Sequence, residues 1–269
     1  MGDRRNTHVV EMRADVVVKR YRSWSYGQPE REWRALKLLH EHVPGVAPVP
    51  VSAHLDEDPP TVVMSRLSGA GLEGPVTTDL ADAIAETLAR IHEAIPQPAL
   101  TGLPPRAGDP VELLNQVRGW SVAPPDPHGD AVLSEALAAG ADWVRRPTLE
   151  KSLMRPAPPV FGTGDGNLAN YLWDGTDLRL VDFEYSGRSD RAFELAEVVE
   201  HISVRASRSG MTRVLDRFEL SAAELRRFRE CRRLLALYWL LRIPAHSQRQ
   251  PGDRTDILAE QATWMLTLL

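Results

Sequence analysis

Short runs of β-branched and aromatic residues dominate the first 67 positions of the chain and predict a small β-rich unit. Residues 8–13 and 15–21 predict a hairpin, and residues 49–55 and 61–67 predict two further strands. Residues 29–40 instead repeat apolar positions at helical spacing, with a proline and glutamates in the first turn. This part of the chain is therefore expected to form strands around one helix.

The remaining residues have a mainly helical pattern. From Thr78 to Ile91 apolar residues recur at intervals of three and four, which is typical of an amphipathic helix. The same spacing predicts helices over residues 111–120, 130–151, 191–206, 221–242 and 253–269. Short strands are predicted at residues 159–161, 171–173 and 178–181. The chain is thus expected to be an α+β protein with two parts, residues 1–67 and residues 68–269.

Three polar residues lie around the predicted hairpin of residues 171–181, which turns at Asp174-Gly175. Asp165 and Asn170 lie in the loop before the hairpin, and Asp182 ends its second strand. Two carboxylates and an amide oxygen suit a hard cation such as Mg²⁺, with ligand positions left for phosphate and water. The glycines lack the third member of a dinucleotide-binding fingerprint, and no Gly-Lys-Ser/Thr follows for a P-loop. The alternative is a solvated hairpin with a helix-capping aspartate.

The spacing Asp165-x4-Asn170, followed by Val181-Asp182-Phe183, resembles the catalytic and metal-binding loops of aminoglycoside phosphotransferases and choline kinases. These families share the protein-kinase-like fold, so the resemblance implies a bilobal molecule with a small β-rich lobe and a large helical lobe. It also implies that Asp165 is the catalytic base and that Asn170 and Asp182 hold Mg²⁺. Thr163 stands where those families usually carry a histidine that braces the loop, which puts the rigidity of this loop in question.

The same resemblance assigns roles in the nucleotide site. Lys19 and Glu32 match the lysine and glutamate that pair in such lobes to aim the ammonium group at the nucleotide phosphates. A lone lysine in a strand is also typical of a solvent-facing edge. Met64 and Arg66 lie in a segment like the linker whose backbone meets the adenine edge, and Met64 equally suits core packing. Glu184 is expected to assist the metal or to orient Lys19.

Other residues near the loop have accessory roles. The resemblance implies that Asn167 is an accessory residue of the catalytic loop. Asp190 is expected to be the N-cap of the helix that follows, because its carboxylate accepts hydrogen bonds from free backbone N–H groups. His201, near the end of that helix, is interpreted as a partnered surface residue.

A glycine-rich loop, which would cover the phosphates in a full lobe of this fold, is missing ahead of Lys19. Only 18 residues precede Lys19, and the sole glycine among them is Gly2. A tight connection at Ala14-Asp15 cannot cover a triphosphate. We therefore expect a shortened lobe with a weak or permissive nucleotide site, in which Lys19, Mg²⁺ and Arg4 or Arg5 contact the phosphates.

Composition and charge narrow the class of protein. A net charge of −5 argues against a general nucleic-acid binder, which would have a basic excess. A single cysteine, Cys231, allows no disulfide within the chain, so a reducing cytoplasm is expected. The amino terminus has no apolar run of signal-peptide length, and residues 234–241 are too short to span a bilayer. A cytoplasmic monomer or homodimer without a membrane partner is predicted.

The predicted reaction moves the γ-phosphoryl group of ATP or GTP to a hydroxyl group of a small molecule. By family likeness the first choice of acceptor is an antibiotic or related natural product: an aminoglycoside, a nucleoside or a peptide. Tyr238, Trp239 and Trp264 are expected either to stack on the acceptor or to belong to the core. A choline-like amino alcohol is the second choice. A catalytically inactive nucleotide-binding protein is the alternative from another class.

Overall fold

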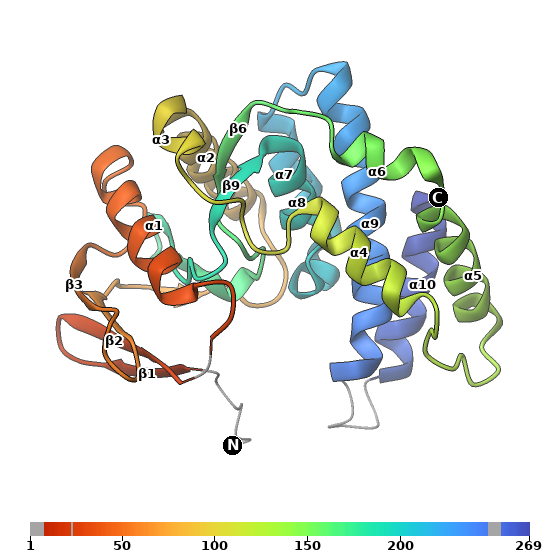
Figure 1. The fold of residues 1–269 in the computed structure, drawn as a ribbon, viewed down its shortest axis with the longest axis horizontal. Helices are drawn as coiled ribbons and strands as arrows, with labels where there is room; N and C mark the ends of the chain where they lie inside the picture. Colours follow the sequence, from red (N-terminus) through yellow and green to blue (C-terminus); the bar gives the residue numbers. More distant parts are fainter. Residues whose placement is uncertain (1–7, 23, 247–253) are drawn as a thin grey trace.

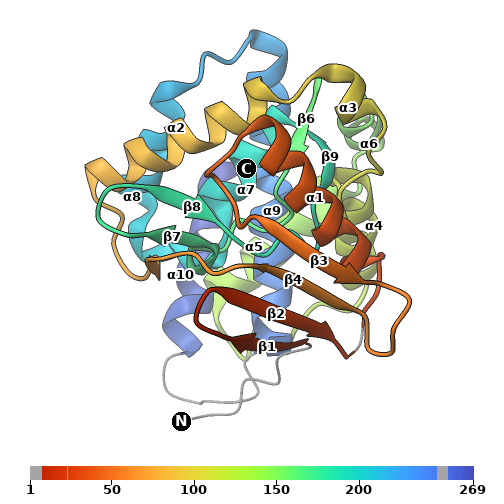
Figure 2. The same ribbon diagram turned by 90° about the vertical axis from the view of Figure 1, so that its left-hand side faces the viewer.

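A four-stranded antiparallel sheet forms the amino-terminal part of the computed structural model, which describes residues 8–22, 24–246 and 254–269. The strands lie side by side in the order β1-β2-β4-β3. Their bounds are His8–Met12 for β1, Val16–Tyr21 for β2, Pro50–His54 for β3 and Thr61–Ser65 for β4. Helix α1 (Gln28–His42) packs against β3 and β4 of the sheet (Figure 2). Its Leu36 and Leu39 are fully buried. The strands and the helix predicted for this part are confirmed.

Lys19 lies in an interior strand of this sheet. β2 pairs with β1 on one side and with β4 on the other, so Lys19 stands opposite both Val10 and Val62. Its side chain is buried, with an exposed fraction of 8%. The interpretation of Lys19 as a residue of a solvent-facing edge is therefore wrong.

Two smaller sheets connect this part to the helices. The first contains β5 (Ala70–Gly71), β7 (Tyr171–Trp173) and β8 (Leu178–Leu180), and the second pairs β6 (Pro159–Gly162) with β9 (Gly187–Asp190). The predicted hairpin of β7 and β8 is confirmed. The side chain of Asp174 accepts the backbone N–H groups of Thr176 and Asp177 and so stabilises its turn. β5 and β9 were not predicted.

Helices make up most of the rest of the described chain. Their bounds are Thr78–Ala94 (α2), Gln97–Thr101 (α3), Pro110–Trp120 (α4), Ala131–Val144 (α5), Pro147–Leu153 (α6), Arg191–Glu200 (α7), Arg208–Thr212 (α8), Ala222–His246 (α9) and Arg254–Leu268 (α10). Three 3₁₀ segments accompany them: Leu168–Asn170 (η1), Ile202–Ser207 (η2) and Arg213–Arg217 (η3). α9 is the central helix and packs against α7, α10 and α4 (Figure 1).

Two helix predictions were wrong in extent. The helix expected over residues 130–151 is divided into α5 and α6, because Pro147 lacks a backbone N–H group and starts a new helix. The helix expected over residues 191–206 ends at Glu200. There His201 turns to an extended backbone conformation, and its ring Nδ1 accepts the N–H of Ser203.

One hydrophobic core runs through both parts of the fold. It joins Leu36 and Leu39 of α1 to Phe183 after β8 and to Leu234 and Leu240 of α9. Within the described residues, every helix is too short or too polar to cross a membrane. The shared core holds the amino-terminal sheet against the β7–β8 hairpin, where the predicted site residues lie.

Candidate active site

Lys19 lies at the centre of a cluster of three carboxyl groups between the amino-terminal sheet and the β7–β8 hairpin. Its Nζ is 2.8 Å from Glu32 of α1, 2.6 Å from Asp182 and 2.7 Å from Glu184. Glu32 is held in turn by the backbone N–H of Phe183, which donates to it at 3.2 Å. The structure therefore brings together four of the predicted site residues, two of which are about 150 positions from the other two in the sequence.

The charges of this cluster are coupled. Burial opposes the charge of Lys19, but Glu32 and Asp182 outweigh it and raise the pKa of Lys19 well above its ordinary value. Burial also opposes ionisation of Glu184, yet the hydrogen bond from His8 and the charge of Lys19 lower its pKa to about 2. Asp182 has one side open to the cavity, but desolvation by the protein atoms around its carboxyl group, with the charge of Glu32, prevails over Lys19 and raises its pKa to about 6. Three carboxyl groups can carry more negative charge than one ammonium group neutralises. The cluster therefore favours the binding of a further cation.

Asp182 presents its carboxylate at the opening of the cluster. Its φ is +69°, in the left-handed region that residues with a Cβ rarely adopt, and its side chain is 41% exposed. One oxygen from each of Glu32, Asp182 and Glu184 lies within 4.8 Å of the others. Carboxylate oxygens at this spacing fit a hard cation such as Mg²⁺. Glu32 is therefore a candidate metal ligand in addition to the predicted Asn170 and Asp182.

A cavity of about 590 Å³ opens beside these groups, between the amino-terminal sheet and the β7–β8 hairpin. Asn170 lines this cavity together with Lys19 and Asp182. Met64 and Arg66 line it where β4 leads into the next segment, and Met64 is also 5% exposed and part of the core. The cavity is large enough for a ligand of nucleotide size.

The connection between β1 and β2 is as short as expected. The N–H of Arg13 donates to the carbonyl of Val16 at 2.9 Å, which closes a tight turn. Such a turn leaves the end of the cavity beside Lys19 to the side chains of Lys19 and its neighbours. Arg4 and Arg5, the other predicted phosphate contacts, lie outside the described residues.

Asp165 lies on the loop between β6 and η1 and faces a second pocket. Its Oδ1 accepts the N–H of Asn167 at 3.0 Å, and its Oδ2 accepts the side-chain amide of Asn170 at 3.3 Å. Asn167 also begins η1, because its own Oδ1 accepts the N–H of Ala169. Asn170 therefore connects Asp165 to the cavity that Asp182 lines.

Helix α7 and Arg106 brace the loop on which Asp165 lies. The backbone N–H of Thr163 donates to Glu194 at 3.1 Å. Arg106 is 3% exposed and donates to the carbonyl of Gly164 at 2.9 Å while it pairs with Glu194 and Glu197. Thr163 replaces the histidine that braces this loop in related families. The contacts of Glu194 and Arg106 hold the loop backbone in place without that histidine. Arg106 was not predicted, because a single arginine in a proline-rich loop gives no periodic signal.

His201 is a second residue that the sequence did not reveal. Its Nε2 lies 3.3 Å from Oδ1 of Asp165, and its Nδ1 accepts the N–H of Ser203. Because Nδ1 is an acceptor there, the ring proton belongs on Nε2, facing Asp165. The Ser203 hydroxyl in turn accepts the N–H of Leu168 at 2.9 Å. His201 is 8% exposed, so its interpretation as a surface residue is wrong.

The pocket in front of Asp165 has a volume of about 280 Å³. Tyr238 and Trp239 of α9 line it, with their ring centroids 5.2 Å apart. Trp264 lies elsewhere, on α10, where its indole N–H donates to Glu200 at 2.6 Å. The structure therefore brings two of the three candidate aromatic residues to Asp165.

Asp190 lies away from both cavities. Its Oδ1 accepts the N–H of Phe193 at 3.1 Å, as expected for the N-cap of α7. Its Oδ2 accepts a hydrogen bond from Arg227 of α9 at 2.7 Å. Asp190 thus fixes the start of the helix whose other end contacts Asp165.

Several solved structures have the same fold. A choline/ethanolamine kinase family protein from Mesorhizobium loti has a TM-score of 0.63 and 17% sequence identity, over 98% of this chain and 85% of that chain. A spectinomycin phosphotransferase in complex with ADP and spectinomycin has a TM-score of 0.64 and 14% identity, over 100% and 92%. A choline kinase from Streptococcus pneumoniae has a TM-score of 0.62 and 15% identity, over 100% and 92%.

These similarities confirm the predicted kinase-like fold, with a small β-rich amino-terminal part and a helical carboxy-terminal part. Among curated proteins, no sequence matches the chain significantly. The family model described as the phosphotransferase enzyme family matches residues 2–231. With the kinase-like fold and a match over most of its length, the chain belongs to the phosphotransferase enzyme family.

Proposed function

We propose that the protein transfers the γ-phosphoryl group of ATP or GTP to a hydroxyl group of a small molecule. The observation that carries this proposal is the contact between Asp165 and Asn170. It joins the cavity that holds Lys19 and Asp182 to the pocket that holds Tyr238 and Trp239. A donor in the first and an acceptor in the second would meet at this contact.

Asp165 is suited to act as the base. It accepts the proton of the acceptor hydroxyl group while the oxygen forms a bond to the γ-phosphorus. The bond from the γ-phosphorus to the bridging oxygen breaks, and ADP or GDP leaves with the electron pair. His201 and Asn170 hold the carboxylate so that its free edge faces the hydroxyl group.

The residues of the first cavity fit Mg²⁺ and phosphate. Asp182 and Asn170 would hold the ion, with Glu32 or Glu184 as a further oxygen ligand. When bound, Mg²⁺ neutralises charge on the phosphates of the donor. Lys19 supports this with its own positive charge, since the carboxylates around it keep it protonated.

The charges of the acceptor pocket favour a hydroxylated ring over a polycation. Glu197 is paired with Arg106, and Glu112 accepts the N–H of Gly108 and the amide of Gln116. Arg242 lies over the ring of Tyr238, with 5.3 Å from its guanidinium carbon to the ring centroid. A bound ammonium group would therefore compete with Arg242 for this ring. A hydroxylated antibiotic or related natural product is the acceptor that we propose.

A screen of nucleotide consumption tests this proposal. The purified protein is incubated with Mg²⁺ and with ATP or GTP over a panel of aminoglycoside, nucleoside and peptide antibiotics and amino alcohols, and each hit is examined by ³¹P NMR. We expect a new phosphate monoester with at least one antibiotic. Products with amino alcohols alone would instead support a choline-kinase-like activity.

The Asp165→Asn variant is the control for this screen. We expect turnover to fall by roughly 10²–10⁴-fold, as for loss of a general base, while the nucleotide affinity stays unchanged. Normal turnover by the variant would refute the role of Asp165. Nucleotide binding without transfer to any small alcohol would favour an inactive nucleotide-binding protein.

A further inference from the structure

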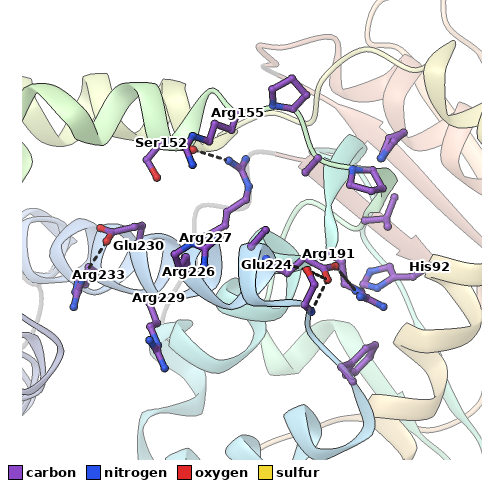
Figure 3. Close-up of a pocket in the computed structure, with 18 of the residues that line it drawn as sticks. His92, Ser152, Arg155, Arg191, Glu224, Arg226, Arg227, Arg229, Glu230 and Arg233 are labelled. Carbon is purple, nitrogen blue, oxygen red and sulfur yellow. Dashed lines mark hydrogen bonds and ion pairs between the residues drawn. The ribbon is translucent and has the colours of Figure 1, made fainter.

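A third cavity lies at the start of α7, the other end of that helix from Asp165, and shares no lining residue with the two cavities above. It has a volume of about 910 Å³ and lies between α2, α6 and α9 (Figure 3). Pro156, Pro158 and Pro159 form one wall. The proposed phosphoryl transfer uses none of these residues, so the cavity needs an explanation of its own.

Three arginines in the walls of this cavity are neutralised by acids. Arg191 pairs with Glu224 at 2.7 Å, and Arg233 pairs with Glu230 at 2.9 Å. Arg227 extends from α9 toward Ser152 and pairs with Asp190 at 2.7 Å (Figure 3). These ion pairs hold the walls of the cavity in place. Little net positive charge remains on the three paired arginines to attract a ligand.

Four more arginines line the cavity without such neutralisation. They come from three segments: Arg146 precedes α6, Arg155 follows it, and Arg226 and Arg229 lie on α9. Within the part of the chain that the structure describes, none of the four has an acidic side chain within 4.0 Å. Glu93 is the remaining acid of the lining. The cavity therefore carries an excess of positive charge, although the chain as a whole has a net charge of −5.

Two lining residues of the cavity have buried polar atoms without partners. Within the described residues, both ring nitrogens of His92 lack a hydrogen-bond partner, although the side chain is only 9% exposed. The Nε of Arg227 is likewise buried and without an acceptor there. Burial and the charge of Arg191 lower the pKa of His92 to about 4, so its ring is neutral and carries one N–H donor. These atoms are closed off from solvent and therefore also from a ligand in the open cavity, so a ligand must be held by the other lining side chains.

We propose that this cavity binds a small multivalent oxyanion, a phosphate ester or a polycarboxylate, whose oxygens accept from the guanidinium groups of Arg146, Arg155, Arg226 and Arg229 and whose charge these groups neutralise. Guanidinium groups match the planar oxygen pairs of carboxylate and phosphate groups. A long polyanion is disfavoured, because the negative charge of the rest of the chain would repel the part that lies outside the cavity. The ligand is therefore small enough to fit within the walls.

Isothermal titration of the full-length protein with inorganic pyrophosphate and, separately, with citrate tests this proposal. A non-hydrolysable ATP analogue is present at saturation so that the nucleotide cavity is occupied. We expect at least one of the two anions to bind with a 1:1 stoichiometry. Binding of pyrophosphate alone would identify a phosphorylated ligand, and binding of citrate alone would identify a polycarboxylate.

The Arg226→Gln/Arg229→Gln double variant locates the binding. Both residues are exposed, so the fold is expected to be unaffected. The dissociation constant should rise at least tenfold, while a matched double variant at the exposed Arg34 and Arg90, outside the lining, should bind as the original chain does. The proposal is overturned if neither anion binds, or if the two double variants bind the anion equally well.

Discussion

Asp165 owes its position to residues that lie far from it in the sequence. His201 approaches one carboxylate oxygen, and the amide of Asn170 approaches the other. Arg106 holds the carbonyl of Gly164, the preceding residue, across a separation of 58 positions. The aspartate is thus oriented from three sides and still lines the pocket that contains Tyr238 and Trp239.

His201 is therefore expected to act as a positioning residue for Asp165. His201 contacts the charged Asp165 electrostatically, and a loss of about 1.4 kcal/mol of transition-state stabilisation is a tenfold change in rate, so His201→Phe should lower kcat by about tenfold. The KM for the nucleotide should hardly change, because His201 does not line the nucleotide cavity. Steady-state kinetics with a hit from the screen measures both constants. His40→Phe, at an exposed position on α1, is the control. A rise in the nucleotide KM at constant kcat would contradict this role.

The residues with a direct role in the proposed chemistry were mostly predictable from the sequence. The residues that hold them in position were not. Asp165, Asn170 and Asp182 follow a spacing that a single loop and hairpin impose on the chain. Arg106 and His201 follow no such spacing, since their partners are set by how α7 packs against the loop. Periodicity reports which face of an element is buried, but it does not report which distant polar group that face meets.

At the scale of elements, α7 connects several features of the molecule. It begins at the N-cap Asp190 beside the basic cavity and carries Glu194 and Glu197, which hold Arg106. It ends at Glu200, next to His201. The sequence predicted its start from Asp190 but not its end, because the side chain of His201 stops the helix by a local hydrogen bond with Ser203.

Asp190→Ala is expected to destabilise the protein strongly. It removes a helix cap, which contributes about 1 kcal/mol, and it leaves the partly buried Arg227 without its carboxylate. We expect the free energy of unfolding to fall by at least about 2 kcal/mol, measured by urea denaturation. Asp190→Asn keeps a capping oxygen and should lose less. Equal losses in the two variants would show that the cap contributes little.

His92 of α2 should make stability depend on pH. Its pKa is lowered to about 4 in the folded chain, by burial and then by Arg191, whereas an unfolded histidine titrates near 6.5. Between these values the unfolded chain binds a proton that the folded chain does not. Stability is therefore lost as the pH falls through this window.

His92→Phe should remove this part of the acid sensitivity. From pH 7.5 to pH 5 the histidine contributes a loss of about 2 kcal/mol in the free energy of unfolding. Urea denaturation at the two pH values should show a smaller drop for the variant than for the original chain. His40→Phe, at an exposed position, should leave the drop unchanged. A variant with the same drop as the original chain would mean that His92 is protonated in the folded state.

At the scale of the whole molecule, the two parts are joined by charge as well as by the core. Lys19 and Glu32 belong to the amino-terminal sheet and its helix, and Asp182 and Glu184 belong to the other part. Arg31 of α1 adds hydrogen bonds to the carbonyls of Pro105 and Ser186. The family resemblance predicted the Lys19–Glu32 pair, and Glu184 was expected near Lys19, whereas the contacts of Arg31 depend on tertiary packing that no local pattern encodes.

The separation of the two cavities at Asp165 and Asn170 has a kinetic consequence. Donor and acceptor would enter by different openings, and neither need leave before the other arrives. Initial velocities should therefore give intersecting double-reciprocal lines, the signature of a ternary complex. ADP or GDP should compete with the donor nucleotide and not with the acceptor. Parallel lines would instead indicate a ping-pong mechanism with a phosphorylated enzyme intermediate. The two substrates would then bind one after the other, and no ternary complex would form.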